Sequence, residues 1–263
     1  AKRIDGLSVH HYSVINWSAK GSATDFSEEQ YFKTMSEAWR MERFLTKNSE
    51  VMDKYDPMKK VALIVDEWGG WYNVEPGSNP AFLYQQNTMR DAMIAGLSLN
   101  IFHNHCDRVR MANLAQTINV LQAVILTSKE KMILTPTYHV MEMYNVHQDA
   151  LMIPVSVTGN EYVLGDKKLT AVSASASKDK NGLVHISLVN IDATKEQAIN
   201  ISLGDIKATA VTGRLLHSQK MQDYNSFTET GKIKPVSFQG ASLSGGELRV
   251  QLPACSVVVL ELK

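Results

Sequence analysis

The chain is organised around one stretch, Val61-Ala-Leu-Ile-Val-Asp-Glu-Trp-Gly-Gly-Trp-Tyr72. Residues 61–65 form an unbroken apolar, partly β-branched run, which favours a central parallel strand covered on both faces. Asp66 and Glu67 follow, where such a strand meets solvent. Successive strand residues point to opposite sides, so only one carboxylate is expected to face a site at the strand's carboxyl end. Taken alone, the two residues are better explained as an ordinary solvated carboxylate pair.

Composition restricts the classes of partner. The chain has 263 residues, 44% of them hydrophobic and 21% charged, which is typical of a globular protein with room for two modest domains. Its 27 basic and 27 acidic residues cancel, so nothing electrostatic points to nucleic acid or an anionic membrane. No apolar run approaches the roughly 20 residues of a membrane span. A neutral substrate such as a sugar fits this charge balance, although the balance alone selects no substrate.

Cysteine and histidine spacing indicates neither a disulfide framework nor a metal centre. Cys106 and Cys255 are the only cysteines and lie far apart, so we expect two buried thiols. His103 and His105 could form a metal pair, but no third ligand stands at a convincing spacing. Asp107 is followed by arginines at 108 and 110, and ion pairs are expected there rather than chemistry. We therefore expect no metal ion and no cofactor.

A short strand is expected near the start of the chain. It covers Ile4 to Val9 and ends in His10-His11-Tyr12. Because side chains two apart on a strand project to the same side, His10 and Tyr12 should lie together. The alternative is that this cluster caps the strand or binds an adventitious metal ion. The loop over 13–26 is long, contains Trp17, and is of the kind that shapes access to a site.

Helices are expected before and after the central strand in the sequence. Ser27-Glu-Glu-Gln30 is a capping-box pattern, and the helix that follows it carries an apolar stripe at three- and four-residue spacing. After Tyr72, Asn79 is a plausible cap for a second helix that has Pro80 in its first turn. The elements expected after it are a strand over 97–102, a helix over 111–126 and a final helix over about 137–148.

From about Leu151 the pattern changes to period-two strands separated by turn residues. Asp179-Lys-Asn-Gly182 is a hairpin signal between two of these strands. We interpret this half as a β-sandwich with a supporting role, which divides the chain into residues 1–150 and 151–263. The clearest strands are expected over 169–176, 183–189, 198–203, 206–212, 248–252 and 256–262.

Several stretches of the first half resemble the α-L-arabinofuranosidases of glycoside hydrolase family 51. The resemblance begins with Asp66-Glu67-Trp68 followed by Trp71-Tyr72 and covers nearly all of residues 1–150. The other matching stretches are Tyr84-Gln-Gln-Asn-Thr-Met-Arg-Asp-Ala92, Ala112-Asn-Leu-Ala-Gln-Thr-Ile-Asn-Val120 and Leu134-Thr-Pro-Thr-Tyr-His-Val140.

The resemblance implies a fold. It places the chain as the C-terminal part, about strands six to eight, of a (β/α)8 barrel, followed by an antiparallel, jelly-roll-like β-sandwich. The first residues correspond to roughly the sixth strand, so the resemblance implies a piece of a longer enzyme. About three strands cannot close a barrel that needs eight. We therefore expect the missing N-terminal barrel half, or self-association, to cover the open strands.

The resemblance also implies an activity and its residues. Glu67 would be the nucleophile of a retaining α-L-arabinofuranosidase that removes terminal non-reducing arabinofuranosides from arabinan- or arabinoxylan-type glycans. His10 and Tyr12 would hold the nucleophile, and Trp71 would form a wall against one face of the sugar. Gln116 would contact sugar hydroxyls, although its spacing alone predicts an ordinary helix amide.

One part of that machinery is not found in the sequence. The family's acid/base glutamate follows an asparagine at a strand end, and Asn160-Glu161 belongs to the second half. The resemblance thus covers the nucleophile side only, and we expect negligible activity from these 263 residues alone. Two alternatives remain: a non-catalytic module that binds sugar or another subunit, and a related retaining glycosidase acting on another furanoside or a xyloside.

Overall fold

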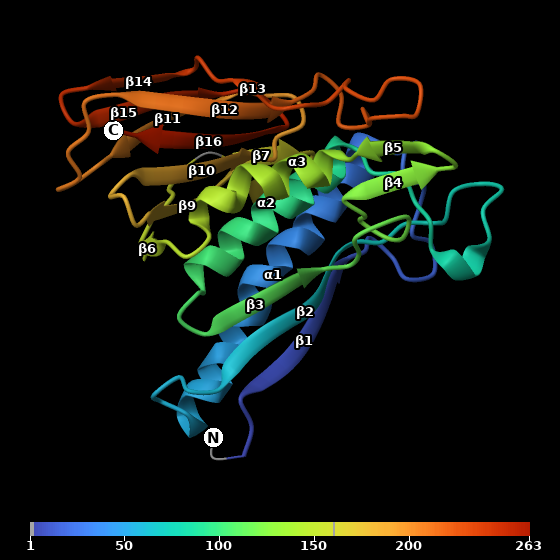
Figure 1. Ribbon diagram of the computed structural model, residues 1–263, viewed down its shortest axis with the longest axis horizontal. Coiled ribbons are helices and arrows are strands. Elements are labelled where there is room, and N and C mark those ends of the chain that lie inside the picture. Colours follow the sequence, from blue (N-terminus) through green and yellow to red (C-terminus); the bar gives the residue numbers. More distant parts are fainter. Residues whose placement is uncertain (1–2, 160) are drawn as a thin grey trace.

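The computed structural model describes residues 3–159 and 161–263 (Figure 1). The first part of the chain is a three-stranded parallel sheet with the order β1-β2-β3. Its strands are β1 (Gly6–Ser13), β2 (Ala62–Gly70) and β3 (Val109–Leu114), connected by helices α1 (Glu28–Tyr55) and α2 (Met89–Asn104). Because crossover connections between parallel strands are right-handed, both helices lie on the same face of the sheet. The central strand is therefore covered on one face only: Leu63 and Val65 are buried, while Ile64 is half-buried.

The remaining elements form antiparallel sheets, short hairpins and small helices. A six-stranded sheet has the order β13-β12-β16-β10-β9-β6, and a three-stranded sheet has the order β11-β15-β14. The bounds are η1 (Pro80–Phe82), β4 (Ile125–Ser128), β5 (Lys131–Leu134), α3 (Pro136–Met143), η2 (Tyr144–His147), β6 (Leu151–Ile153), β7 (Glu161–Leu164), β8 (Lys167–Thr170), β9 (Val172–Lys178), β10 (Val184–Asn190), β11 (Gln197–Ser202), β12 (Val211–His217), β13 (Val236–Ser237), β14 (Ala241–Ser244), β15 (Glu247–Leu252) and β16 (Ser256–Leu262).

Helix α1 confirms the expected start and apolar stripe. Ser27 is its N-cap and completes a capping box with Gln30. Trp39 is half-buried and donates its indole N–H to the carbonyl of Thr170 at 3.1 Å. The stripe that is buried against the sheet and α2 consists of Tyr31, Met35, Ala38, Met41 and Leu45.

The expected positions of the second helix and the next strand are wrong. Asn79 caps only the short turn η1, whereas α2 begins after Thr88, which forms a capping box with Asp91. The run 97–102, expected as a strand, is the second half of α2. Its residues are buried on nearly every side of the helix, the polar Ser98 and Asn100 included, because α2 is enclosed by the parallel sheet, by α1 and by the six-stranded sheet. A helix covered on every side loses the 3.6-residue pattern that distinguishes it from a buried strand.

The helix expected over 111–126 is also wrong. Residues 109–114 are strand β3, which is hydrogen-bonded in parallel to β2, and the chain then forms a loop that reaches β4. The final helix of the first half is found as α3 followed by the 3-10 turn η2.

In the second half, most expected strands are present. The turn at 179–182 joins β9 and β10 in an antiparallel hairpin, as predicted. The strand expected over 206–212 instead covers 211–217 as β12. A largely apolar hollow of about 550 Å³ lies between β9 and β10 on one side and β11 on the other.

The two cysteines form no disulfide, and the charged residues just before β3 form ion pairs. Both cysteines are free thiols, Cys255 buried and Cys106 only half-buried. Asp107 pairs with Lys59 rather than with its neighbouring arginines, and the fully buried Arg108 pairs with two aspartates of the α1 end, Asp53 and Asp56. None of the helices in the described part of the chain is long and apolar enough to cross a membrane.

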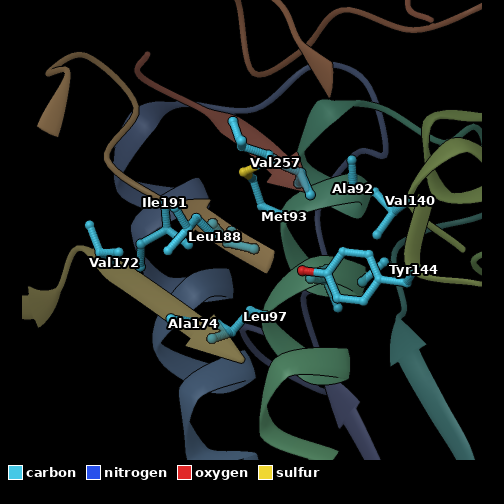
Figure 2. Packing of buried hydrophobic residues seen from close by; sticks show 14 of the residues in the cluster. Ala92, Met93, Leu97, Val140, Tyr144, Val172, Ala174, Leu188, Ile191 and Val257 are labelled. Atoms are coloured by element: carbon cyan, nitrogen blue, oxygen red, sulfur yellow. The ribbon is translucent and has the colours of Figure 1, made fainter. Parts of the chain in front are cut away.

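Helix α2 lies close to the six-stranded sheet at Gly96. A Cβ atom there would lie 2.8 Å from Val189 Cγ2 and 3.2 Å from Val257 Cγ2, so only glycine permits this separation. Around it, Met93 and Leu97 of α2 pack against buried side chains of β9, β10 and β16 (Figure 2). One continuous hydrophobic core therefore joins the two halves of the chain.

Three histidines lie together next to this contact. The two ring nitrogens of His147 form hydrogen bonds: Nδ1 lies 2.7 Å from Ser177 Oγ and Nε2 lies 2.6 Å from Ser187 Oγ. The rings of His103 and His185 have centroids 4.7 and 6.4 Å from that of His147. Burial lowers the pKa of His103 to about 4 and, with the neighbouring imidazoles, that of His147 to about 3.

The Gly96 contact gives the first prediction. Gly96→Val should lower the free energy of unfolding by about 1–3 kcal/mol, because the β-branched side chain would force α2 away from β10 and β16. Urea unfolding of the purified protein measures this change. Gly231→Val is the matched control, since a Cβ at Gly231 meets no atom within 4 Å. Equal stability of the two variants would contradict the close approach.

The histidine cluster gives a pH prediction. Because folding lowers the pKa of His103 and His147, the unfolded chain binds more protons below pH 6.5, and stability should fall as pH decreases through this range. Each histidine contributes a slope of up to about 1.4 kcal/mol per pH unit. Unfolding free energies measured between pH 4.5 and 6.5 should show a shallower slope for His147→Gln than for the wild type. Identical slopes would show that His147 does not contribute to the pH dependence of unfolding.

Candidate functional site

A β-bulge lies at the carboxyl end of β2. Val9 of β1 is opposite Val65, but the next residue, His10, is opposite Glu67, so Asp66 is the extra residue in β2. The bulge brings both carboxylates within reach of one imidazole, despite the alternation of a regular strand. Asp66 Oδ1 is 2.9 Å from His10 Nε2, and Glu67 Oε2 is 3.7 Å from His10 Nδ1.

Glu67 makes a second, shorter contact. The hydroxyl of Tyr12 donates a hydrogen bond to Glu67 Oε2 at 2.6 Å. Burial, followed by this hydrogen bond and the charge of Glu67, raises the pKa of Tyr12 well above its ordinary value. The phenol therefore keeps its proton over the physiological pH range and stabilises negative charge on the carboxylate.

Glu67 lies in a hollow of about 430 Å³ that opens at the ends of β1 and β2. Of the two carboxylates, Glu67 lines it and Asp66 does not, in agreement with the expectation that one of them faces the site. The complete lining is His10, His11, Tyr12, Val14, Trp17, Glu37, Arg40, Glu67 and Trp71.

Aromatic rings form one wall of this hollow. The ring of Trp71 stands edge-on to that of Tyr12, with centroids 5.1 Å apart, and to that of Trp17, with centroids 5.6 Å apart. The ammonium group of Lys20 lies 5.9 Å from the ring of Trp17 and 5.6 Å from that of Trp71. Trp17 is 60% exposed, so the wall is open to solvent at its outer end.

Gln116 is the one expected site residue that does not line the hollow. It is exposed and follows Ala115 in the loop after β3, instead of lying on a helix. The other four, Glu67, His10, Tyr12 and Trp71, lie together at the ends of two adjacent strands.

The hollow also has walls that sequence reasoning missed. Glu37 and Arg40 project from α1 and form an ion pair at 2.6 Å. Their spacing of three residues on the polar side of the expected helix was the available signal, but it is shared by many solvated pairs. Gln85 and Gln122, which do not line the hollow, are fully buried and form hydrogen bonds with the backbone at the end of β2 and just after it.

The arrangement offers an ionisable carboxylate, hydroxyl and imidazole donors and a stacking surface. Within residues 3–159 and 161–263, no group of three or more His, Cys, Asp or Glu side chains is placed to hold a metal ion. Such a site can bind a neutral, ring-shaped ligand and direct a carboxylate at it.

Comparison with known proteins connects this chain to a family. The family model described as the α-L-arabinofuranosidase C-terminal domain matches residues 66–256. The chain is 49% identical, over 99% of its length, to the intracellular exo-α-L-arabinofuranosidase of Bacteroides ovatus, and it covers 51% of that protein.

Solved structures agree. The family 51 arabinofuranosidase of Xanthomonas axonopodis pv. citri superposes with a TM-score of 0.98 at 45% identity, over all of this chain and 53% of that one. A family 51 α-L-arabinofuranosidase of Bifidobacterium longum shares the fold, with a TM-score of 0.83 at 22% identity over the same shares of the two chains. The chain thus spans about half the length of these relatives, and it belongs to glycoside hydrolase family 51, the α-L-arabinofuranosidases, as their C-terminal portion.

Proposed function

We propose that these 263 residues are the nucleophile-bearing part of a retaining α-L-arabinofuranosidase that acts on terminal arabinofuranosyl units of arabinan- or arabinoxylan-type glycans. The observation that carries the proposal is the 2.6 Å hydrogen bond from Tyr12 to Glu67 inside a hollow walled by Trp71. The family membership supports the reaction class. The balanced charge of the chain suits a neutral sugar.

In the proposed reaction, one oxygen of Glu67 attacks the anomeric carbon of the arabinofuranosyl unit. The bond from that carbon to the leaving oxygen breaks, and a separate acid supplies the proton that this oxygen takes up. The conjugate base of that acid then accepts a proton from water. The water oxygen attacks the anomeric carbon, the bond to Glu67 breaks, and the sugar is released with net retention. Tyr12 and His10 hold the carboxylate in place, and Trp71 packs against one face of the sugar.

We propose that the acid/base carboxyl comes from polypeptide outside these 263 residues. Glu37 is the other glutamate in the lining, and its carboxylate is already engaged in an ion pair with Arg40. Glu161 begins β7 and pairs with Lys168, and Asn160 lies outside the described residues. Gln116, exposed here beside the sheet, becomes a sugar contact in this proposal only when the site is completed.

The fold supports the same separation of the nucleophile from the acid/base carboxyl. We propose that residues 1–150 contribute three strands to a (β/α)8 barrel, and that residues 151–263 form a β-sandwich. On the face of the parallel sheet away from the helices, Ile64 lies opposite Met111, which is 52% exposed. A closed barrel would bury both side chains in its interior. The missing barrel half is the natural cover, and a second copy of the chain is the alternative.

The decisive experiment is covalent trapping. The full-length polypeptide that carries these residues should be inactivated by an epoxide-type or fluorinated α-L-arabinofuranoside, and peptide mapping should place the label on Glu67. The 263-residue chain alone should hydrolyse an aryl arabinofuranoside at a negligible rate, because a second carboxyl group is required.

Each other outcome has a distinct meaning. Wild-type-like turnover by the isolated chain would contradict the proposed origin of the acid/base group. A label on another carboxylate would overturn the role of Glu67, and binding of arabinose without any turnover by the full-length protein would favour a sugar-binding module. Turnover of a xyloside in preference would identify the related-glycosidase alternative.

The contact with Tyr12 can be tested separately. Tyr12→Phe in the full-length enzyme removes the donor to Glu67 and should lower kcat by roughly 10- to 100-fold, the value of one hydrogen bond to a charged group. Steady-state kinetics on an aryl arabinofuranoside measure this change. Tyr55→Phe is the matched control, because Tyr55 is 83% exposed at the far end of α1 and should leave kcat unchanged.

A further inference from the structure

The backbone that carries Trp71 is held by a buried side-chain amide. Gln85 is fully buried, and its Oε1 accepts a hydrogen bond from the Tyr72 N–H at 2.9 Å. Its Nε2 donates to the Gly70 carbonyl at 3.1 Å. These two backbone groups belong to the peptide units immediately before and after Trp71. One amide therefore fixes both peptide planes that set the direction of the Trp71 side chain.

This pairing replaces a missing strand neighbour. Strand β2 ends at Gly70, so the following peptide groups have no partner in the parallel sheet. A primary amide presents a donor and an acceptor side by side, as a backbone peptide does. Gln85 thus extends the hydrogen-bonding of the strand by one residue on the side away from solvent.

A second buried amide, in the loop after β3, connects the same turn to α2. Gln122 Oε1 accepts from the Gly70 N–H at 2.5 Å, and its Nε2 donates to the Asp91 carbonyl at 2.9 Å. Gly69, with a φ of +146°, lies so close that a Cβ there would be 3.1 Å from Gln122 Cβ. The peptide groups from Gly69 to Tyr72 are therefore fixed from behind by two glutamines.

Ring contacts connect the position of Trp71 to the carboxylate of Glu67. Trp71 stands edge-on to Tyr12, with an interplanar angle of 66°, and Tyr12 bonds Glu67. A rotation of the Trp71 backbone would change both the wall of the hollow and the packing of the phenol that holds Glu67.

We propose that Gln85 is a positioning residue of the sugar site, which acts by holding Trp71 at the angle at which its ring meets the substrate. The inference rests on the proposed function for its kinetic consequence, but the orientation of Trp71 can be tested without it. The competing explanation is that Gln85 only satisfies two buried peptide groups and contributes to stability alone.

The test is a double-mutant cycle in the full-length protein with Gln85→Met, Trp71→Ala and the double variant. Methionine preserves the length of the side chain and removes both hydrogen bonds. If Gln85 acts through Trp71, Gln85→Met should lower kcat/KM about tenfold in the wild type, the scale of a small misplacement of a substrate-positioning group, and less than about twofold in Trp71→Ala. Equal losses in both backgrounds, or no loss in a folded Gln85→Met protein, would overturn the inference.

A spectroscopic cycle separates this inference from the proposed function. Near-ultraviolet circular dichroism reports the surroundings of tryptophan rings, so Gln85→Met should change the spectrum of the wild type but not that of Trp71→Ala. A positive spectroscopic cycle in a protein without arabinofuranosidase activity would overturn the proposed function and leave the positioning role standing. An unchanged spectrum would overturn the positioning role itself.

Two further variants guard against an effect of stability alone. Asn190 is another fully buried amide, in β10, which donates to the carbonyls of Lys195 and Pro253 far along the chain from the site. Asn190→Leu should lower the Tm and leave kcat/KM within twofold below the transition. If Gln85→Met does not fold, Gln85→Glu replaces it in both cycles, because it keeps the acceptor for Tyr72 and loses the donor to Gly70.

Discussion

The structure depends on the enclosure of helix α2. Its residues from Met89 to Leu97 are buried on every side, between the parallel sheet with α1 and the six-stranded antiparallel sheet (Figure 2). Gly96 permits the close approach to the antiparallel sheet, and the carbonyl of Asp91, in the first turn, receives the amide of Gln122 that also holds Gly70. The same helix therefore supports the core and, through Gln122, the turn that carries the site.

This enclosure also explains where sequence reasoning failed. The amphipathic helix α1, whose opposite side faces solvent, was predicted from its capping box and stripe, whereas the run 97–102 in α2 was predicted as a strand. Periodicity reports a helix only when one side remains polar. The capping box at Thr88 and Asp91 was a local signal for the true start of α2. A strand over 97–102 also places the next helix on residues 109–114, which form β3 in the structure.

The candidate site divides in the same way. The family resemblance named Glu67, His10, Tyr12 and Trp71, and strand spacing alone predicted only that His10 and Tyr12 lie on one side. The four lie together because adjacent parallel strands bring their carboxyl ends to one edge of a sheet. The bulge at Asp66 has no signature in the sequence, yet it determines that two carboxylates share one imidazole. Glu37, Trp17 and the buried amides reach the site from a helix and from loops. Their roles depend on tertiary contacts that no local pattern records.

On the proposal that Glu67 is the nucleophile, its neighbours have two different effects. Some act on the charge of the carboxylate, and one determines the shape of the hollow around it. Tyr12 and His10 come from one strand and contact Glu67 directly, so they act on its charge and orientation. Trp71 acts on shape, and its position is set by Gln85 from the protected side of the sheet. A nucleophile needs both, because hydrogen bonds orient its carboxylate while a rigid wall decides where the anomeric carbon lies. The two strand ends thus form a self-contained half of a site, to which an acid need only be added from the opposite side of the sugar.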